Sequence, residues 1–149
     1  MAAFLATWFL CSVGFCSPQV QVDSTQAQPW QNVTAIEFKK IVETDSTVLL
    51  LDVRSQSEYD RGHLAGAHLF PYNQLSDRSK ELPVDHQRVI LVYCHSGHRS
   101  QLAAETLVKL GYKKVVNLSA GFSEWKRCQL PIEVTPPPVS KPPEQKPNE

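Results

Sequence analysis

The sequence predicts an α/β fold, in which a parallel sheet is covered by helices on both faces. Residues 89–93 are all aliphatic or aromatic, and residues 48–53 form a second, nearly continuous apolar run. Strands of this kind are typical of sheets that are buried on both sides. Helical patterns separate the strands along the chain, which favours parallel pairing. With 149 residues, of which 42% are hydrophobic, the chain is long enough for one domain with tails.

Local signals place the elements in chain order. Thr34 and Glu37 have the spacing of a capping box, which predicts the start of a helix. Gly62 and Pro71 interrupt regular structure, whereas Gly111 follows apolar residues at helical spacing and predicts a helix C-cap. The predicted elements are a helix at 34–41, a strand at 48–53, a helical turn at 57–61, a short strand at 68–70, a weak helix or irregular segment at 73–80, a strand at 89–93, a helix at 100–110, a strand at 115–118 and a helix at 122–127.

A cysteine stands where the strand at 89–93 ends. Cys94 is followed by a short polar loop with Gly97, then by Arg99 and by Ser100, which we expect to cap the next helix. In open α/β sheets, ligands bind at the carboxyl ends of the strands. The N–H groups of the loop, the helix dipole and the arginine all favour a negative charge on the sulfur. The pattern therefore predicts a thiolate nucleophile.

The spacing from Cys94 to Arg99, C-x-x-x-x-R, resembles the active-site loop of the rhodanese family, sulfurtransferases that carry sulfane sulfur as a cysteine persulfide. Three further motifs in the expected order strengthen the resemblance. They are LLDVR at 50–54 with EY at 58–59, GHLAGA at 62–67, and LSAGFSEW at 118–125. The resemblance covers roughly residues 32–132 and implies a three-layer α/β/α domain around a parallel five-stranded sheet.

The resemblance also implies an activity. Cys94 would attack thiosulfate or a similar donor and release sulfite, and cyanide or a thiol would then take the sulfur from the persulfide. Gly97 allows the positive φ that points loop amides inward, and Arg99 contacts the donor oxyanion or braces the loop. No cofactor and no metal is expected. The expected loop and substrate-binding residues are His95, Ser96, Gly97, His98, Arg99, Ser100 and Asp52.

Three residues close to the site are expected to be structural. The family resemblance suggests that Arg54 pairs with Glu58, which would hold the turn after the strand at 48–53. His63 is expected to satisfy buried backbone groups in the turn that follows. Two positions depart from the family pattern: His95 stands where active single-domain members often have Arg or Lys, and Ala120 stands where Gly is usual. The histidine leaves the loop less cationic at neutral pH.

Other functions remain as alternatives. A phosphatase or arsenate reductase shares the fold and a Cys…Arg loop, but its loop is one residue longer. A non-catalytic sulfur carrier or protein-binding module is the alternative outside enzymology. A metal held by Cys94, His95 and His98 is disfavoured, because ligands within five residues of one loop splay apart. Cys128 is expected at the surface, with a role as redox partner of Cys94 as the alternative.

The net charge limits the possible binding partners, and the N-terminal segment predicts where the protein is located. Fifteen basic residues balance fifteen acidic ones, which gives no case for nucleic acid or an anionic membrane as a partner. The apolar run at 2–15 has the length of a signal-peptide core and is shorter than the roughly 20 residues of a membrane helix. We expect an exported, periplasmic or secreted monomer without stable membrane insertion, a lipid or membrane anchor being the alternative. The expected division is a signal peptide at 1–17, a flexible lead-in at 18–31, the domain at 32–133 and a disordered Pro-rich tail at 134–149.

Overall fold

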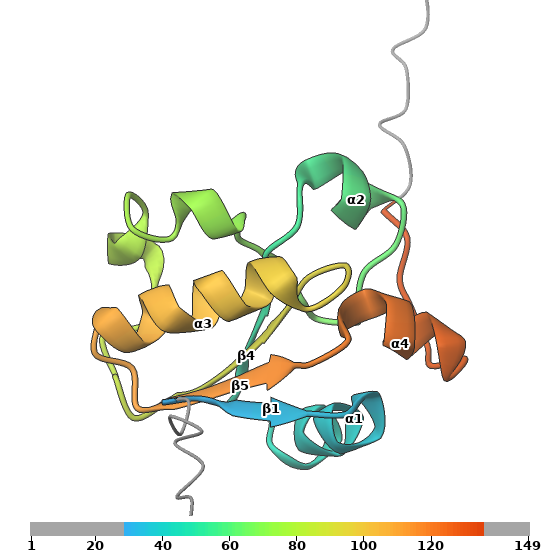
Figure 1. Cartoon of the computed structure of the whole chain (residues 1–149), viewed down its shortest axis with the longest axis horizontal. Coiled ribbons are helices and arrows are strands. Elements are labelled where there is room, and N and C mark those ends of the chain that lie inside the picture. The colour runs from blue at the N-terminus through green and yellow to red at the C-terminus, as the bar shows by residue number, and fades with distance from the viewer. Residues whose placement is uncertain (1–28, 136–149) are drawn as a thin grey trace, which may run out of the picture.

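A fully parallel, five-stranded sheet forms the centre of the structure, a computed structural model that describes residues 29–135 (Figure 1). The strand order is β1-β5-β4-β2-β3. The predicted α/β/α fold with five parallel strands is confirmed. The strands are β1 (Gln31–Val33), β2 (Leu49–Asp52), β3 (His68–Leu69), β4 (Val89–Tyr93) and β5 (Lys114–Leu118).

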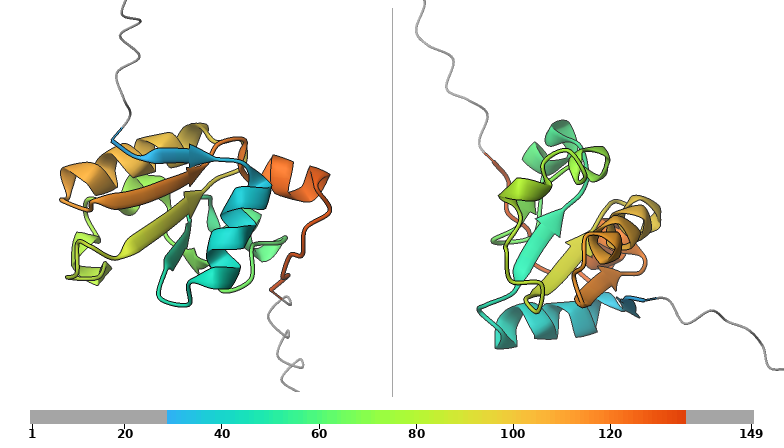
Figure 2. Two further views of the ribbon diagram at one scale, coloured as in Figure 1. Left: turned by 90° about the horizontal axis from the view of Figure 1, so that it is seen from below. Right: turned by 90° about the vertical axis from the view of Figure 1, so that its left-hand side faces the viewer.

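Helices cover both faces of the sheet, and Figure 2 shows α1 and α3 on opposite sides of it. On one face, α3 packs through Ala103, Ala104 and Leu107. On the other face, Phe38 of α1 and Trp125 of α4 are buried together, with their rings edge to face. The segment predicted as a weak helix forms two 3-10 turns. The helices are α1 (Ala35–Thr44), α2 (Gln56–Asp60), α3 (His98–Lys109) and α4 (Gly121–Arg127), and the 3-10 turns are η1 (Tyr72–Gln74) and η2 (Ser79–Glu81).

The strand β1 adds the fifth member of the sheet. It pairs with β5, and the Asn117 side chain donates a hydrogen bond of 2.8 Å to the Asn32 side chain. Its first residue, Gln31, lies in the segment predicted as lead-in, and Trp30 already packs against the core. The lead-in prediction therefore ran too far at its C-terminal end.

Register brings the ends of β2 and β4 level. Asp52 pairs with Tyr93, and the next residue, Val53, donates its N–H to the Tyr93 carbonyl at 3.0 Å. Cys94 follows directly, so the carboxyl ends of both strands present their polar residues at one edge of the sheet.

Several predictions concern the termini. The signal peptide at 1–17, most of the lead-in and nearly all of the Pro-rich tail lie outside the described residues, so they stay predictions, as does export. Within residues 29–135, no helix combines the length and the apolar character that crossing a membrane requires.

Candidate active site

Cys94 lies at the carboxyl end of β4, beneath the loop that leads into α3. None of its surface is exposed. The Gly97 N–H donates a hydrogen bond to its Sγ at 3.2 Å, and the Ser100 Oγ lies 3.5 Å from the same atom. The sulfur therefore faces a backbone donor and a hydroxyl at the N-terminus of a helix, where partial positive charge is concentrated.

Hydrogen bonds to α4 hold the first two carbonyls of the loop. The N–H groups of Phe122 and Ser123, in the first turn of α4, donate to the carbonyls of Cys94 and His95 at 2.8 and 3.0 Å. Gly121 makes this approach possible, since a Cβ there would lie 2.6 Å from the Cys94 carbonyl oxygen. With its carbonyls held by α4, the loop can turn amides inward.

Gly97 is required by its conformation and by its neighbours. Its φ is 94°, in the left-handed region that we expected, and a Cβ would lie 1.9 Å from the Ser119 carbonyl oxygen. The prediction that Ser100 caps the helix is wrong, because α3 begins at His98 and Gly97 is its N-cap. The Ser100 hydroxyl instead donates to the Gly97 carbonyl at 2.9 Å, inside the first turn.

Arg99 pairs with Glu58, and this corrects the expected pairing of Arg54 with Glu58. The two guanidinium N–H groups of Arg99 donate to the two carboxylate oxygens, both at 2.7 Å. The hydrogen bond from Arg99 is the largest cause that lowers the pKa of Glu58, to about 2. The same hydrogen bond raises the pKa of Arg99, to which Cys94 also contributes. Arg99 therefore braces the loop against α2.

Arg54 is buried and pairs with Asp52. Its Nε and Nη2 donate to the carboxylate at 2.6 to 3.0 Å, and its guanidinium lies 4.2 Å from the Phe122 ring centre. Burial lowers the pKa of Arg54, but its hydrogen bond and charge attraction to Asp52 outweigh this and raise it overall. The Tyr93 hydroxyl donates to Asp52 at 2.6 Å. Asp52 is fully buried and does not line the cavities that Arg54 and Arg99 share, so its carboxylate holds Arg54 and Tyr93 beneath the site.

A cavity of about 360 Å³ opens over the loop, and we call it the mouth. Among residues 29–135, neither Arg61 nor Lys126 forms an ion pair, so both charges are free to meet an anion. Sequence reasoning missed both residues, because they come from separate segments that only the fold brings together. The mouth is lined by Arg54, Glu58, Arg61, His95, Arg99, Phe122, Lys126 and Ile132.

The remaining predicted residues lie around the loop. His95 is exposed, with its ring 3.3 Å from the Ser123 Oγ, whereas Ser96 and His98 are exposed and do not line the mouth. His63 is buried behind the site, stacks on Tyr59 and has its Nδ1 3.0 Å from the Tyr59 carbonyl.

Potential metal ligands and the two cysteines of the domain are the remaining groups to place. Among the residues that the structure describes, no three His, Cys, Asp or Glu side chains come close enough to hold a metal ion. Cys94 and Cys128 are both free thiols, and Cys128 is half-buried at the end of α4.

Comparisons with known proteins agree with this geometry. The sequence profile of the rhodanese-like domain matches residues 34–128. The chain is 35% identical over 102 residues to YrkF of Bacillus subtilis (strain 168), named as a candidate sulfur carrier protein; the match covers 68% of this chain and 54% of YrkF. It is 36% identical over 94 residues to a sulfurtransferase of Allochromatium vinosum, covering 63% of this chain and 85% of the relative.

Two further matches extend the comparison. The chain is 37% identical over 79 residues to the thiosulfate sulfurtransferase GlpE of Coxiella burnetii, covering 53% of this chain and 72% of GlpE. The crystal structure of the Alr3790 protein from Anabaena superposes with a TM-score of 0.62 at 32% identity, over 68% of this chain and 80% of that one. The chain spans only 54% and 59% of the length of two Bacillus subtilis relatives, YrkF and YqhL.

Proposed function

Because the chain belongs to the rhodanese-like domain family, we propose that it is a sulfurtransferase that moves sulfane sulfur from thiosulfate to a thiophilic acceptor through a Cys94 persulfide. The observation that carries the proposal is the cysteine itself. Its Sγ accepts the Gly97 N–H at the start of α3, and two residues of the same loop, His95 and Arg99, line the mouth. Two other cations of the mouth, Arg61 and Lys126, are unpaired among residues 29–135. The names of the relatives from Allochromatium vinosum and Coxiella burnetii support the same chemistry.

In the first step, the Cys94 thiolate attacks the outer, sulfane sulfur of thiosulfate. A bond forms between Sγ and that sulfur, the S–S bond of thiosulfate breaks, and its electron pair leaves on sulfite. The persulfide that remains on Cys94 carries one negative charge, as the thiolate did. The Gly97 N–H at 3.2 Å and the N-terminus of α3 stabilise that charge before and after the step.

The residues of the mouth recognise the sulfur donor. Arg99 is engaged by Glu58, so Arg61 and Lys126 supply the free positive charge that attracts a dianion. Since Cys94 has no exposed surface in the resting structure, side chains of the mouth move aside when the donor reaches Sγ.

The phosphatase alternative is disfavoured by the loop. Only four residues separate Cys94 from Arg99, one fewer than in phosphatases, and the arginine is held by Glu58. A sulfur carrier without its own turnover would form the same persulfide but discharge it only to a protein partner. YrkF is named as a candidate sulfur carrier protein.

Thiocyanate formation from thiosulfate and cyanide tests the proposal. We expect turnover by the wild type and none by Cys94→Ser. Arg61→Gln and Lys126→Gln should each raise the KM for thiosulfate roughly two- to fivefold, since each removes one partly screened charge. Lys40→Gln, an exposed lysine on α1, is the matched control and should leave the KM unchanged. Turnover by Cys94→Ser, or equal effects of all three charge variants, would overturn the proposed site.

A further inference from the structure

A cavity of about 470 Å³ lies at the amino ends of β1, β4 and β5, and we call it the rear cavity. These strands are parallel neighbours, so their first residues meet at one edge of the sheet (Figure 1). Val89, the first residue of β4, lines the rear cavity, whereas Cys94 follows the last residue of the same strand. At about 3.3 Å per residue, the strand separates the two by roughly 15 Å. The rear cavity is therefore distinct from the site of sulfur transfer.

Most of the wall of the rear cavity is apolar. Val115 and Val116 of β5 and Ile41 of α1 contribute aliphatic side chains. Trp30, which precedes β1, also lines it. Sites for small molecules typically measure about 300 to 1,000 Å³, and the rear cavity lies within this range. This part of the wall suits the apolar body of a small ligand.

Two lysines, Lys113 and Lys114, give the rear cavity a positive charge. Both are exposed, and neither forms an ion pair with residues 29–135. The nearby carboxylate of Asp45 is held by Thr47, whose hydrogen bonds lower the pKa of Asp45 most, and the charge of Lys114 lowers it further. No Asp or Glu is among the described residues that line the rear cavity. Its lining therefore attracts an anion.

Trp30 supplies a hydrogen-bond donor without an acceptor. Its indole Nε1 is buried and has no hydrogen-bond partner among the residues that the structure describes. The Trp125 Nε1, by contrast, donates to the Pro131 carbonyl at 2.8 Å. Buried polar groups in proteins are nearly always hydrogen-bonded, so an acceptor beside Trp30 is expected. A ligand seated against the Trp30 ring would bring an oxygen acceptor next to this N–H.

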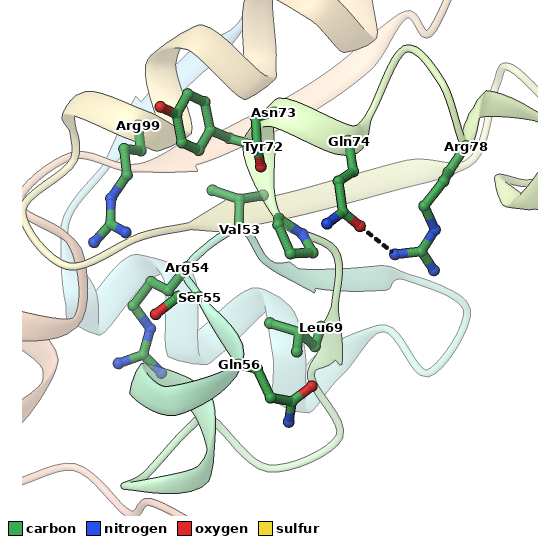
Figure 3. A pocket seen from close by; sticks show the side chains of 11 residues that line it. Val53, Arg54, Ser55, Gln56, Leu69, Tyr72, Asn73, Gln74, Arg78 and Arg99 are labelled. Atoms are coloured by element: carbon green, nitrogen blue, oxygen red, sulfur yellow. Dashed lines mark hydrogen bonds between the residues drawn. The ribbon is translucent and has the colours of Figure 1, made fainter.

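The larger cavity of about 610 Å³ beside the mouth lacks this combination (Figure 3). Arg54, Arg78 and Arg99 line it, and a carboxylate pairs with each of them at 2.6 to 2.7 Å. The mouth does hold unpaired cations, Arg61 and Lys126, but it belongs to the site already described. Of these three cavities, only the rear cavity combines unpaired lysines, an apolar wall and a buried donor without an acceptor.

From these observations we infer that the rear cavity is a second ligand site, and that its ligand is a small amphipathic carboxylic acid. The apolar body of the ligand packs against Ile41, Val115 and Trp30. Its carboxylate lies at the amino groups of Lys113 and Lys114. A carboxylate accepts hydrogen bonds from ammonium and from indole donors. The inference goes beyond sulfur transfer, and no bond is made or broken at the rear cavity.

Octanoate is the probe that tests the inference, titrated into the isotope-labelled full chain and followed by NMR. We expect amide shifts concentrated at Lys113, Lys114 and Val115, with a Kd of roughly 1 mM, typical of a weak small ligand. The Trp30 indole N–H resonance should move downfield. The Trp125 indole resonance is the internal control and should stay, because this N–H already has a backbone acceptor.

Three related compounds separate the role of the charge from that of the apolar wall. Octanol and octylamine keep the chain without the negative charge, and acetate keeps the charge without the chain. Each should bind more weakly than octanoate by about fivefold or more. Equal binding of octanol or octylamine would remove the role of the lysines, and equal binding of acetate would remove that of the apolar wall. Either result would overturn the inference.

Substitutions locate the bound anion. Lys113→Gln and Lys114→Gln should each raise the Kd for octanoate about two- to fivefold, since each removes one exposed charge. Lys80→Gln, an exposed lysine of η2 that does not line the rear cavity, is the matched control and should leave the Kd unchanged. Shifts confined to Arg61 and Lys126, with a raised KM for thiosulfate, would place octanoate in the mouth and contradict the inference.

The Trp30 resonance also tests whether the rear cavity is open to a ligand. An indole resonance that octanoate does not move would mean that another part of the chain supplies its acceptor. That result, like the absence of any shift up to about 10 mM octanoate, would refute the proposed ligand site. The binding readouts do not depend on Cys94, so they separate failure of this inference from failure of the proposed function.

Discussion

Glu58→Gln tests the ion pair that braces the cysteine loop. The Glu58 carboxylate accepts two hydrogen bonds from Arg99 at 2.7 Å. It also accepts from the Ser55 N–H at 3.2 Å and from the Ser55 hydroxyl at 3.0 Å, as the reciprocal part of a capping box. Glutamine keeps an oxygen for the cap and removes the charge, so the main loss is the pair with Arg99, the largest cause of the lowered pKa, with a smaller loss at the Ser55 hydrogen bonds.

The size of the effect follows from the pKa of Glu58. A pKa lowered from 4.5 to about 2 corresponds to roughly 3 kcal/mol of stabilisation. The Glu58 and Arg99 side chains are 23% and 30% exposed, so solvent screening reduces this. We expect Glu58→Gln to lower the free energy of unfolding by about 1 to 2 kcal/mol at pH 7. In a domain of this size, that corresponds to a Tm lower by about 5 to 10 °C.

The stabilisation by Glu58 depends on pH, and the lowered pKa determines the direction of that dependence. The folded-state pKa of Glu58 is depressed, so the unfolded chain takes up a proton near pH 4.5 while the folded protein does so only near pH 2. The stabilisation is therefore complete above pH 4.5 and is lost as pH falls toward 2. Urea unfolding of wild type and Glu58→Gln at pH 7, 5 and 3 should give a difference that is largest at pH 7 and less than half as large at pH 3.

A matched control separates this pair from surface pairs in general. Glu105→Gln breaks the exposed pair with Lys109 on α3 and should change stability by less than about 0.5 kcal/mol. A Glu58→Gln difference that is the same at every pH, or no larger than that of the control, would refute the reasoning.

Three further substitutions test the frame of the site. Gly97→Ala should lower the urea midpoint and reduce thiocyanate formation, since its Cβ would lie 1.9 Å from the Ser119 carbonyl oxygen; normal stability would mean that the loop relaxes freely. Tyr93→Phe should cost about 1 to 3 kcal/mol in urea unfolding, because buried Asp52 loses the donor at 2.6 Å; a neutral effect would show that water replaces it. Asp52→Asn should cost about 3 to 5 kcal/mol because it leaves the Arg54 charge buried and uncompensated, and a loss below that of Tyr93→Phe would contradict this.

The sequence was sufficient where a local signal decides the structure. The apolar runs located β2 and β4, and the capping box located the start of α1. The cysteine at the end of β4 and the positive φ of Gly97 follow from residue types at fixed positions in the loop. Each of these features depends on neighbours in the chain.

The sequence did not predict the features that depend on contacts between residues far apart in the chain. The strand β1 is three residues long and partly polar, and only its pairing with β5 makes it a strand. The predicted partner of Glu58 was Arg54, and no local signal pointed to Arg99, which lies 41 residues further along the chain. The pairing of β2 with β4 buries Asp52 against Tyr93, and buried Arg54 pairs with Asp52, while Glu58 pairs with Arg99.

The position of a helix start and the cavities were also beyond local signals. The predicted cap of α3 was Ser100, whereas the helix begins three residues earlier, with Gly97 as its N-cap packed against the Ser119 carbonyl that follows β5. The mouth joins Arg61 after α2 with Lys126 of α4, and no spacing rule connects these two residues.

Intact mass of the protein after incubation with thiosulfate tests the central claim most directly. We expect the wild type to gain one sulfur atom, about 32 Da, and to lose it when cyanide is added. Cys128→Ser should gain the same mass, and Cys94→Ser should gain none. No gain on reduced wild-type protein, or a gain that persists in Cys94→Ser, would contradict a persulfide on Cys94.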